Sequence, residues 1–231
     1  MYQEKASQSQ PNTSTVTISF PEINVPVRAA HQLRGFFGDM FREHSPLLHN
    51  HYADGQLRYG YPLVQYKVIH NKPILVGVEE GAKLLAELFF QMKSLQLNGK
   101  TYSVYERDIT FKKMTLGVGT ELYDYRFETL YMALNQENHT EYLAKTPDEQ
   151  RAFLGRILTG NILSFYKGIG LFLPPEARIM TTFRPGKETT TGFKNQRMLA
   201  FTGQFTTNAL LPDLVGLGKS VSRGFGAISK I

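Results

Sequence analysis

The hydrophobic pattern of the first half of the chain changes period several times. Polar and apolar residues alternate over 15–20, as in a strand with one buried face. Over 28–41 the apolar residues recur every three or four positions, which predicts an amphipathic helix. Further along, the pattern predicts strands over 63–69 and 74–78 joined by a hairpin connection at 70–73, a helix over 79–95 and a strand over 102–111. This order of strand, helix, strand, strand, helix, strand is the ferredoxin-like order.

The second half repeats this order without a clear second helix. A helix is expected to begin at Thr146, because Thr146 can cap it, Pro147 suits a first turn and Glu149 completes a capping box. Strands are predicted over 122–134, 178–183, 197–206 and 225–231. We expect a joint at 117–119 and a loop at 189–192. The fold class indicated is α+β, with helices packed on one face of antiparallel sheets.

Composition narrows the class of protein. The 231 residues include 26 Lys and Arg against 20 Asp and Glu, a net charge of +6, and no cysteine. Disulfides, thiolate metal sites and a cysteine nucleophile are therefore excluded. No apolar run reaches the length of a membrane span, and the first 14 residues lack the apolar core of a signal peptide. We expect a soluble cytoplasmic protein whose positive charge either attracts a polyanion or only maintains solubility.

A glycine-rich loop at 216–226 is the most distinctive motif. It does not fit a phosphate-binding P-loop, because Asp213 stands where the first glycine is required. It does not fit a dinucleotide fingerprint either, because Val221 stands at a glycine position. Two interpretations stay open: a phosphate-binding loop in which Lys219 and Arg223 supply the charge, or a flexible turn before an edge strand.

One face of the helix predicted over 28–41 is unusual. It carries His31, Arg34, Gly35, Gly38 and Arg42. Glycine weakens a helix by about 1 kcal/mol relative to alanine, so the two glycines suggest that another group approaches closely. His31 is either part of a functional site or an ordinary solvated histidine.

Together these motifs resemble a known family. The glycines at 216, 218, 224 and 226 near the C-terminus resemble the signature of the repeat-associated RNA-binding superfamily of CRISPR systems. Residues 33–35, 47–51, 61–67 and 79–81 resemble its repeat-processing endoribonuclease branch. The resemblance covers residues 28–231. It implies two tandem ferredoxin-like (RRM-like) domains, which we place at 15–118 and 119–231 after a flexible tail at 1–14.

The resemblance also implies an activity. Enzymes of this branch cleave the CRISPR precursor transcript within each repeat without a metal or other cofactor, leaving a 2′,3′-cyclic phosphate and a 5′-hydroxyl. Such cleavage needs a base, an acid and cations near the phosphate. The candidate catalytic residues are His49, His51 and His31, with Tyr52 in reserve. The candidate RNA-binding residues are Arg34, Gly216, Gly218, Lys219, Arg223, Gly224 and Gly226, with Arg58, Lys67 and Lys194 as weaker candidates.

Other interpretations remain at this stage. The histidines could be solvated, or His44 and the pair at 49 and 51 could form a metal site. The chain could be a non-catalytic repeat-RNA-binding subunit of a CRISPR effector complex. It could also be a general RNA-recognition module, although the motif at 223–227 fails at Ala227. The expected partner is CRISPR repeat RNA. Other effector subunits and a second copy of the chain are further candidates, and no membrane partner is expected.

Overall fold

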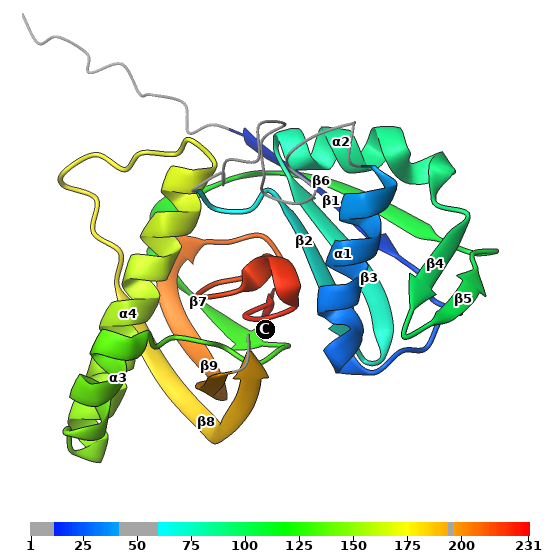
Figure 1. Cartoon of the computed structure of the whole chain (residues 1–231). Helices are drawn as coiled ribbons and strands as arrows, with labels where there is room; N and C mark the ends of the chain where they lie inside the picture. Colours follow the sequence, from blue (N-terminus) through cyan, green and yellow to red (C-terminus); the bar gives the residue numbers. More distant parts are fainter. Residues whose placement is uncertain (1–11, 42–59, 194–195) are drawn as a thin grey trace, which may run out of the picture.

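The computed structural model in Figure 1 describes residues 12–41, 60–193 and 196–231. It contains two four-stranded antiparallel sheets, one formed before Leu116 and one after it. Within the described ranges, no helix is long and apolar enough to cross a membrane.

The first sheet has the strand order β2-β3-β1-β6. Helices α1 and α2 share one hydrophobic core with its strands. The elements are β1 (Asn12–Ser19), η1 (Val27–Ala29), α1 (Ala30–Met40), β2 (Val64–Ile69), β3 (Lys72–Val78), α2 (Glu80–Leu88) and β6 (Asp108–Thr115). The predicted ferredoxin-like order is confirmed for this half.

The connection between β2 and β3 is tighter than expected. His70 and Asn71 have φ angles of 49° and 64°, so both central residues of the turn are left-handed. A two-residue turn of this kind matches the twist of the strands that it joins. Lys72 and Pro73, predicted to lie in the connection, already pair with β2.

The segment after α2 differs from the prediction. The helix expected over 79–95 ends at Leu88, and the strand expected over 102–111 is wrong as one strand. A 3-10 turn, η3 (Phe89–Gln91), leads instead into a separate hairpin of β4 (Ser94–Leu97) and β5 (Lys100–Ser103). Leu95 and Leu97 are buried in the core beside α1. These two leucines follow directly on the apolar residues of the predicted helix. A short apolar run fits the period of a helix and that of a strand, so the sequence did not separate the two elements.

The second sheet has the order β10-β7-β9-β8, which repeats the arrangement of the first sheet. The segment with η4 stands where a second helix would lie. The elements are β7 (Gly117–Phe127), α3 (Gln136–Leu143), α4 (Pro147–Gly168), β8 (Thr181–Phe193), β9 (Gln196–Leu210), η4 (Val221–Arg223) and β10 (Ile228–Lys230). The predicted fold class, α+β with tandem ferredoxin-like units, is confirmed.

Two segments expected to be irregular are strands. Gly117 and Val118 belong to β7 and pair with β9, so the connection between the sheets is Leu116 alone. Residues 189–192 belong to β8, where Thr189 pairs with Ala200. Threonine is β-branched and favours extended backbone, and here a long partner strand overrides the turn composition.

The helices of the second half begin at side-chain caps. Thr146 and Glu149 form the predicted capping box at the start of α4. Helix α3 was not predicted from the sequence. Asn135 and Asn138 form a second capping box there, but α3 buries only Tyr142, so it has little apolar periodicity to detect.

Strands β2 and β3 are buried on both faces. Tyr66 belongs to the core under α1 and α2, whereas Val76 and Val78 belong to the core of the second half. Neighbouring residues of a strand point to opposite faces. Gln65 and Lys67 therefore share the face that the second half covers, and both are fully buried.

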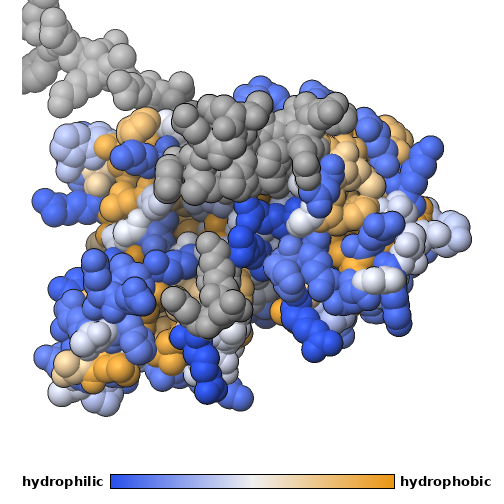
Figure 2. Space-filling view, in the orientation of Figure 1, coloured by the Kyte–Doolittle hydropathy of each residue, from blue (hydrophilic) through white to orange (hydrophobic). Residues whose placement is uncertain are grey.

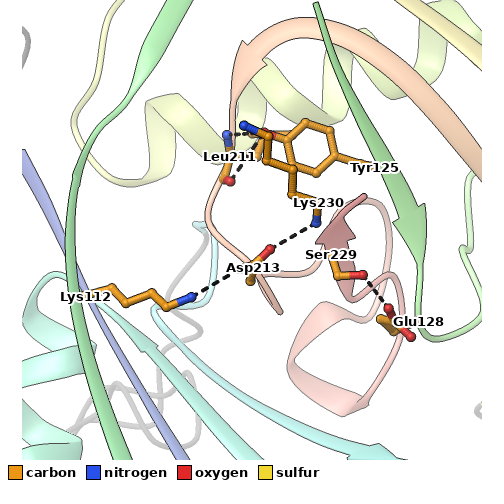
Figure 3. Close-up of polar contacts among 7 residues, drawn as sticks. All are labelled: Lys112, Tyr125, Glu128, Leu211, Asp213, Ser229 and Lys230. Carbon is orange, nitrogen blue, oxygen red and sulfur yellow. Dashed lines mark hydrogen bonds and ion pairs between the residues drawn. The ribbon is translucent and has the colours of Figure 1, made fainter.

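The end of the chain also connects the two halves (Figure 3). Asp213 accepts hydrogen bonds from Nζ of Lys112 on β6, at 3.2 Å, and from the backbone N–H of Lys230 on β10, at 3.0 Å. Ser229 donates to Glu128 nearby. The Lys112–Asp213 ion pair is exposed, so it contributes little to stability.

Candidate functional site

The glycine-rich loop lies against the first half of the molecule. The backbone N–H of Gly216 donates to Oε1 of Gln65 at 2.9 Å, and the Tyr61 hydroxyl donates to the Gly216 carbonyl at 2.8 Å. Nε2 of Gln65 donates to the Tyr61 hydroxyl at 2.6 Å. Burial raises the pKa of Tyr61, which keeps its hydroxyl protonated and able to donate.

Lys67 holds the other end of the same loop. Its Nζ donates to the carbonyl of Val221 at 2.8 Å and to that of Phe225 at 3.1 Å. The side chain is completely buried, and burial lowers its pKa to about 7. Lys67 was a weaker candidate for contacting the RNA backbone, and this is corrected, because its ammonium group is enclosed by the protein.

The glycines of the loop are explained by close packing within the protein. Gly224 has a φ of 103°, and a Cβ at this position would lie 2.6 Å from Cβ of Ala30. A Cβ at Gly216 would lie 2.7 Å from Nζ of Lys67, and one at Gly218 would lie 2.7 Å from the Met132 carbonyl. Gly226 is enclosed by Leu217 in the same way. This packing alone accounts for glycine at all four positions.

A cavity of about 400 Å³ lies where α1, the glycine-rich loop and β8 meet. It brings together three residues chosen from the sequence: His31, Arg223 and Gly224. His31 is exposed on the first turn of α1, and Arg223 is half-buried in η4. The other lining residues are Val27, Arg28, Thr129, Leu130, Thr191, Gly192 and Phe225.

A further cation, Arg34 of α1, lies near Arg223. Burial and the neighbouring Arg223 cation lower the pKa of Arg34, while the nearby Tyr66 acts in the opposite direction. Arginine nevertheless stays protonated in proteins. Two positive charges, from α1 and from the glycine-rich loop, are therefore held near each other, and an anion placed between them would reduce their repulsion.

Two other positions singled out from the sequence, Lys219 and Gly35, do not line the cavity. Lys219 is exposed and does not line it, while its backbone N–H donates to the Met132 carbonyl at 3.0 Å. Gly35 is exposed with open space around its missing Cβ, so no part of the described chain approaches it closely. Seven candidates lie outside the described residues: Arg42, His44, His49, His51, Tyr52, Arg58 and Lys194.

The sequence did not predict the residues that the second half contributes to the lining of this cavity. Thr129 and Leu130 follow β7, and Thr191 and Gly192 lie in β8. No motif marks them as part of a site, and they line the cavity only because the second half packs beside α1. The face of the molecule in Figure 2 is mostly hydrophilic, with apolar patches over both halves.

Across the part of the chain that the structure describes, no three His, Asp or Glu side chains form a metal-binding group.

Comparisons with known proteins agree with this architecture. Residues 12–115 match the model of the Cas6b N-terminal domain, and residues 117–231 match that of the Cas6b C-terminal domain. A crystal structure of Cas6b is 31% identical with a TM-score of 0.89, covering 96% of this chain and all of that one. A crystal structure described as the CRISPR RNA processing endoribonuclease Cas6b is 28% identical with a TM-score of 0.76, at the same coverage.

An uncharacterised protein of Methanocaldococcus jannaschii is 28% identical over 147 residues, which are 64% of this chain and 99% of that protein. Two tandem ferredoxin-like units, with a glycine-rich loop of the second unit packed against the first, define a protein of the CRISPR repeat-associated RNA-binding class. Within that class, the chain belongs to the Cas6b family.

Proposed function

We propose that this protein is a metal-independent endoribonuclease that cleaves CRISPR precursor RNA within its repeats. The observation that carries the proposal is the cavity that unites His31, Arg223 and Gly224 from the two halves of a Cas6b-family chain. A relative at 28% identity is described as a CRISPR RNA processing endoribonuclease, which supports the same substrate class.

The proposed reaction is attack by a ribose 2′-oxygen on the adjacent phosphorus. A base takes the proton of the 2′-hydroxyl as the new P–O bond forms. The bond from phosphorus to the 5′-oxygen breaks, and an acid protonates that oxygen. The products are a 2′,3′-cyclic phosphate and a 5′-hydroxyl. Each well-placed acid or base contributes about 10²- to 10⁴-fold to such a reaction.

The residues around the cavity match these roles. His31 is exposed at the cavity, where its imidazole can act as an acid or a base. Arg223, with Arg34 beside it, can stabilise the negative charge that develops on the phosphate. His49 and His51, which lie outside the described residues, are the other two proposed acids or bases.

The test is an RNA cleavage assay with excess EDTA, using the repeat RNA encoded beside the protein's own gene. Wild type is compared with His31→Ala, His49→Ala and His51→Ala. The matched control is His139→Ala in α3, which does not line this cavity. We expect one cut ending in a cyclic phosphate, lost in at least one of the three variants while RNA binding persists, and retained in the control.

Two results would reject the proposal. Cleavage that occurs only after Mg²⁺ is added would reject metal independence. Tight binding without cleavage, with or without Mg²⁺, would show a non-catalytic RNA-binding subunit instead.

A further inference from the structure

A fully buried lysine reaches across the boundary between the two halves. Lys67 lies on β2, and its ammonium group donates to two carbonyls of the glycine-rich loop, those of Val221 and Phe225. These residues lie on either side of Arg223 and Gly224, both of which line the cavity. Holding the two carbonyls therefore restrains the backbone that carries the cavity residues.

Further hydrogen bonds restrain the backbone of the rest of the loop. The backbone N–H of Arg223 donates to the Ser220 carbonyl at 2.8 Å, which closes the turn from within. At the start of the loop, Gln65 and Tyr61 hold both backbone groups of Gly216. Two residues of β2, Gln65 and Lys67, together with Tyr61 just before this strand, therefore hold the loop of the second half at both ends.

A buried ammonium group is a costly way to fill this space. Moving a charge out of water is unfavourable, and an apolar side chain of similar length often packs in such a place with equal or greater stability. The lowered pKa of Lys67 reflects this cost. A methionine at this position could fill the space but could not donate hydrogen bonds to the two carbonyls. Those hydrogen bonds set the position of the loop.

We propose that Lys67 is a positioning residue, which acts through the carbonyls of Val221 and Phe225 to fix Arg223 and Gly224 in the cavity. The functional part of this inference rests on the proposed ribonuclease activity. The structural part, that Lys67 immobilises the loop, does not depend on any activity.

The first measurement is hydrogen exchange of the peptide covering 215–226, which needs no RNA. Wild type is compared with Lys67→Met, with Lys67→Arg and with the control Lys100→Met. Lys100 is exposed in β5, on the side of the first half away from the loop (Figure 1). We expect exchange of this peptide to rise at least tenfold in Lys67→Met and to stay unchanged in Lys100→Met, with Lys67→Arg between them because a guanidinium group also donates.

The second measurement separates RNA binding from cleavage. A displacement of about 1 Å in a catalytic group can reduce a rate about 10²-fold. We therefore expect single-turnover cleavage by Lys67→Met to fall about 10²-fold while the Kd for repeat RNA changes less than threefold, and cleavage by Lys67→Arg to be partly restored.

Equal exchange in wild type and Lys67→Met would overturn the proposal. So would cleavage and binding that fall by the same factor. If Lys67→Met does not fold, Lys67→Arg against Lys100→Met decides, and equal loop exchange in those two variants would also overturn it. If the wild type cleaves no RNA, the proposed ribonuclease activity fails, while the exchange experiment still decides whether Lys67 holds the loop.

Discussion

Gly224 of the glycine-rich loop packs directly against Ala30, the first residue of α1, so that an added Cβ would lie 2.6 Å from the alanine Cβ. The backbone of Gly224 is also left-handed, with a φ of 103°. The contact joins the loop of the second half to the helix that carries His31. It explains why this loop position is a glycine without reference to any ligand.

Replacing Gly224 with alanine should therefore destabilise the fold. We expect Gly224→Ala to lower the free energy of unfolding by about 1–3 kcal/mol, because it adds both steric overlap and backbone strain. Urea denaturation followed by circular dichroism measures the change. Gly35→Ala on α1 is the control, and we expect it to be neutral or stabilising by up to about 1 kcal/mol, since space there is open. Equal losses in both variants would contradict this assignment.

The Tyr61 hydroxyl should be needed for stability as well as position. Tyr61→Phe removes the donor to the buried Gly216 carbonyl and one of the two acceptors of Gln65 Nε2, which keeps the Pro62 carbonyl. Such losses cost about 1–3 kcal/mol. Thermal or urea denaturation should show this loss for Tyr61→Phe and none for Tyr105→Phe, whose side chain is 82% exposed. An unchanged free energy of unfolding in Tyr61→Phe would mean that this hydrogen bond does not contribute to stability.

The stability contributed by Lys67 should depend on pH. Folding lowers its pKa from 10.5 to about 7. Between these values the unfolded chain binds a proton that the folded protein does not. The free energy of unfolding therefore rises with pH, by up to about 1.4 kcal/mol per pH unit from this group. Below about pH 7 both states are protonated and this rise disappears.

Denaturation of wild type and Lys67→Met at pH 7, 8 and 9 tests this linkage. The unfolding free energy of wild type minus that of the variant should increase with pH over this range, since the variant lacks the titrating group. Lys100→Met serves as the control and should follow wild type. A difference that stays flat or decreases with pH would contradict the lowered pKa.

Arg34 and Arg223 should contribute to RNA affinity in a salt-dependent way. If Arg34 or Arg223 contacts a phosphate, replacing it with alanine should reduce the slope of log affinity against log salt concentration by about 0.7–1. Fluorescence anisotropy with repeat RNA at several KCl concentrations measures this slope. An unchanged slope in both variants would show that neither cation contacts a phosphate. Lys100→Ala, far from the cavity, should leave the slope unchanged.

Local sequence signals predicted the framework well where one residue pattern has one structural meaning. The alternation over 15–20 became β1, and the capping residues Thr146 and Glu149 began α4. The apolar run after Glu79 was misassigned because it fits both a helix and a strand. The threonines at 189–191 were misassigned because their partner strand β9 follows only later in the chain.

The candidate site divided along the same line. His31, Arg223 and Gly224, which line one cavity, could be singled out from the sequence, because helix periodicity and glycine spacing are properties of neighbouring residues. The burial of Lys67 against the loop could not be predicted in this way, since its partner Val221 lies 154 positions away along the chain. A lysine on a strand is solvated when that face of the sheet is exposed, and it binds buried carbonyls only when another part of the chain covers the face. That contact forms only when the two halves pack together, and no local pattern of residues encodes it.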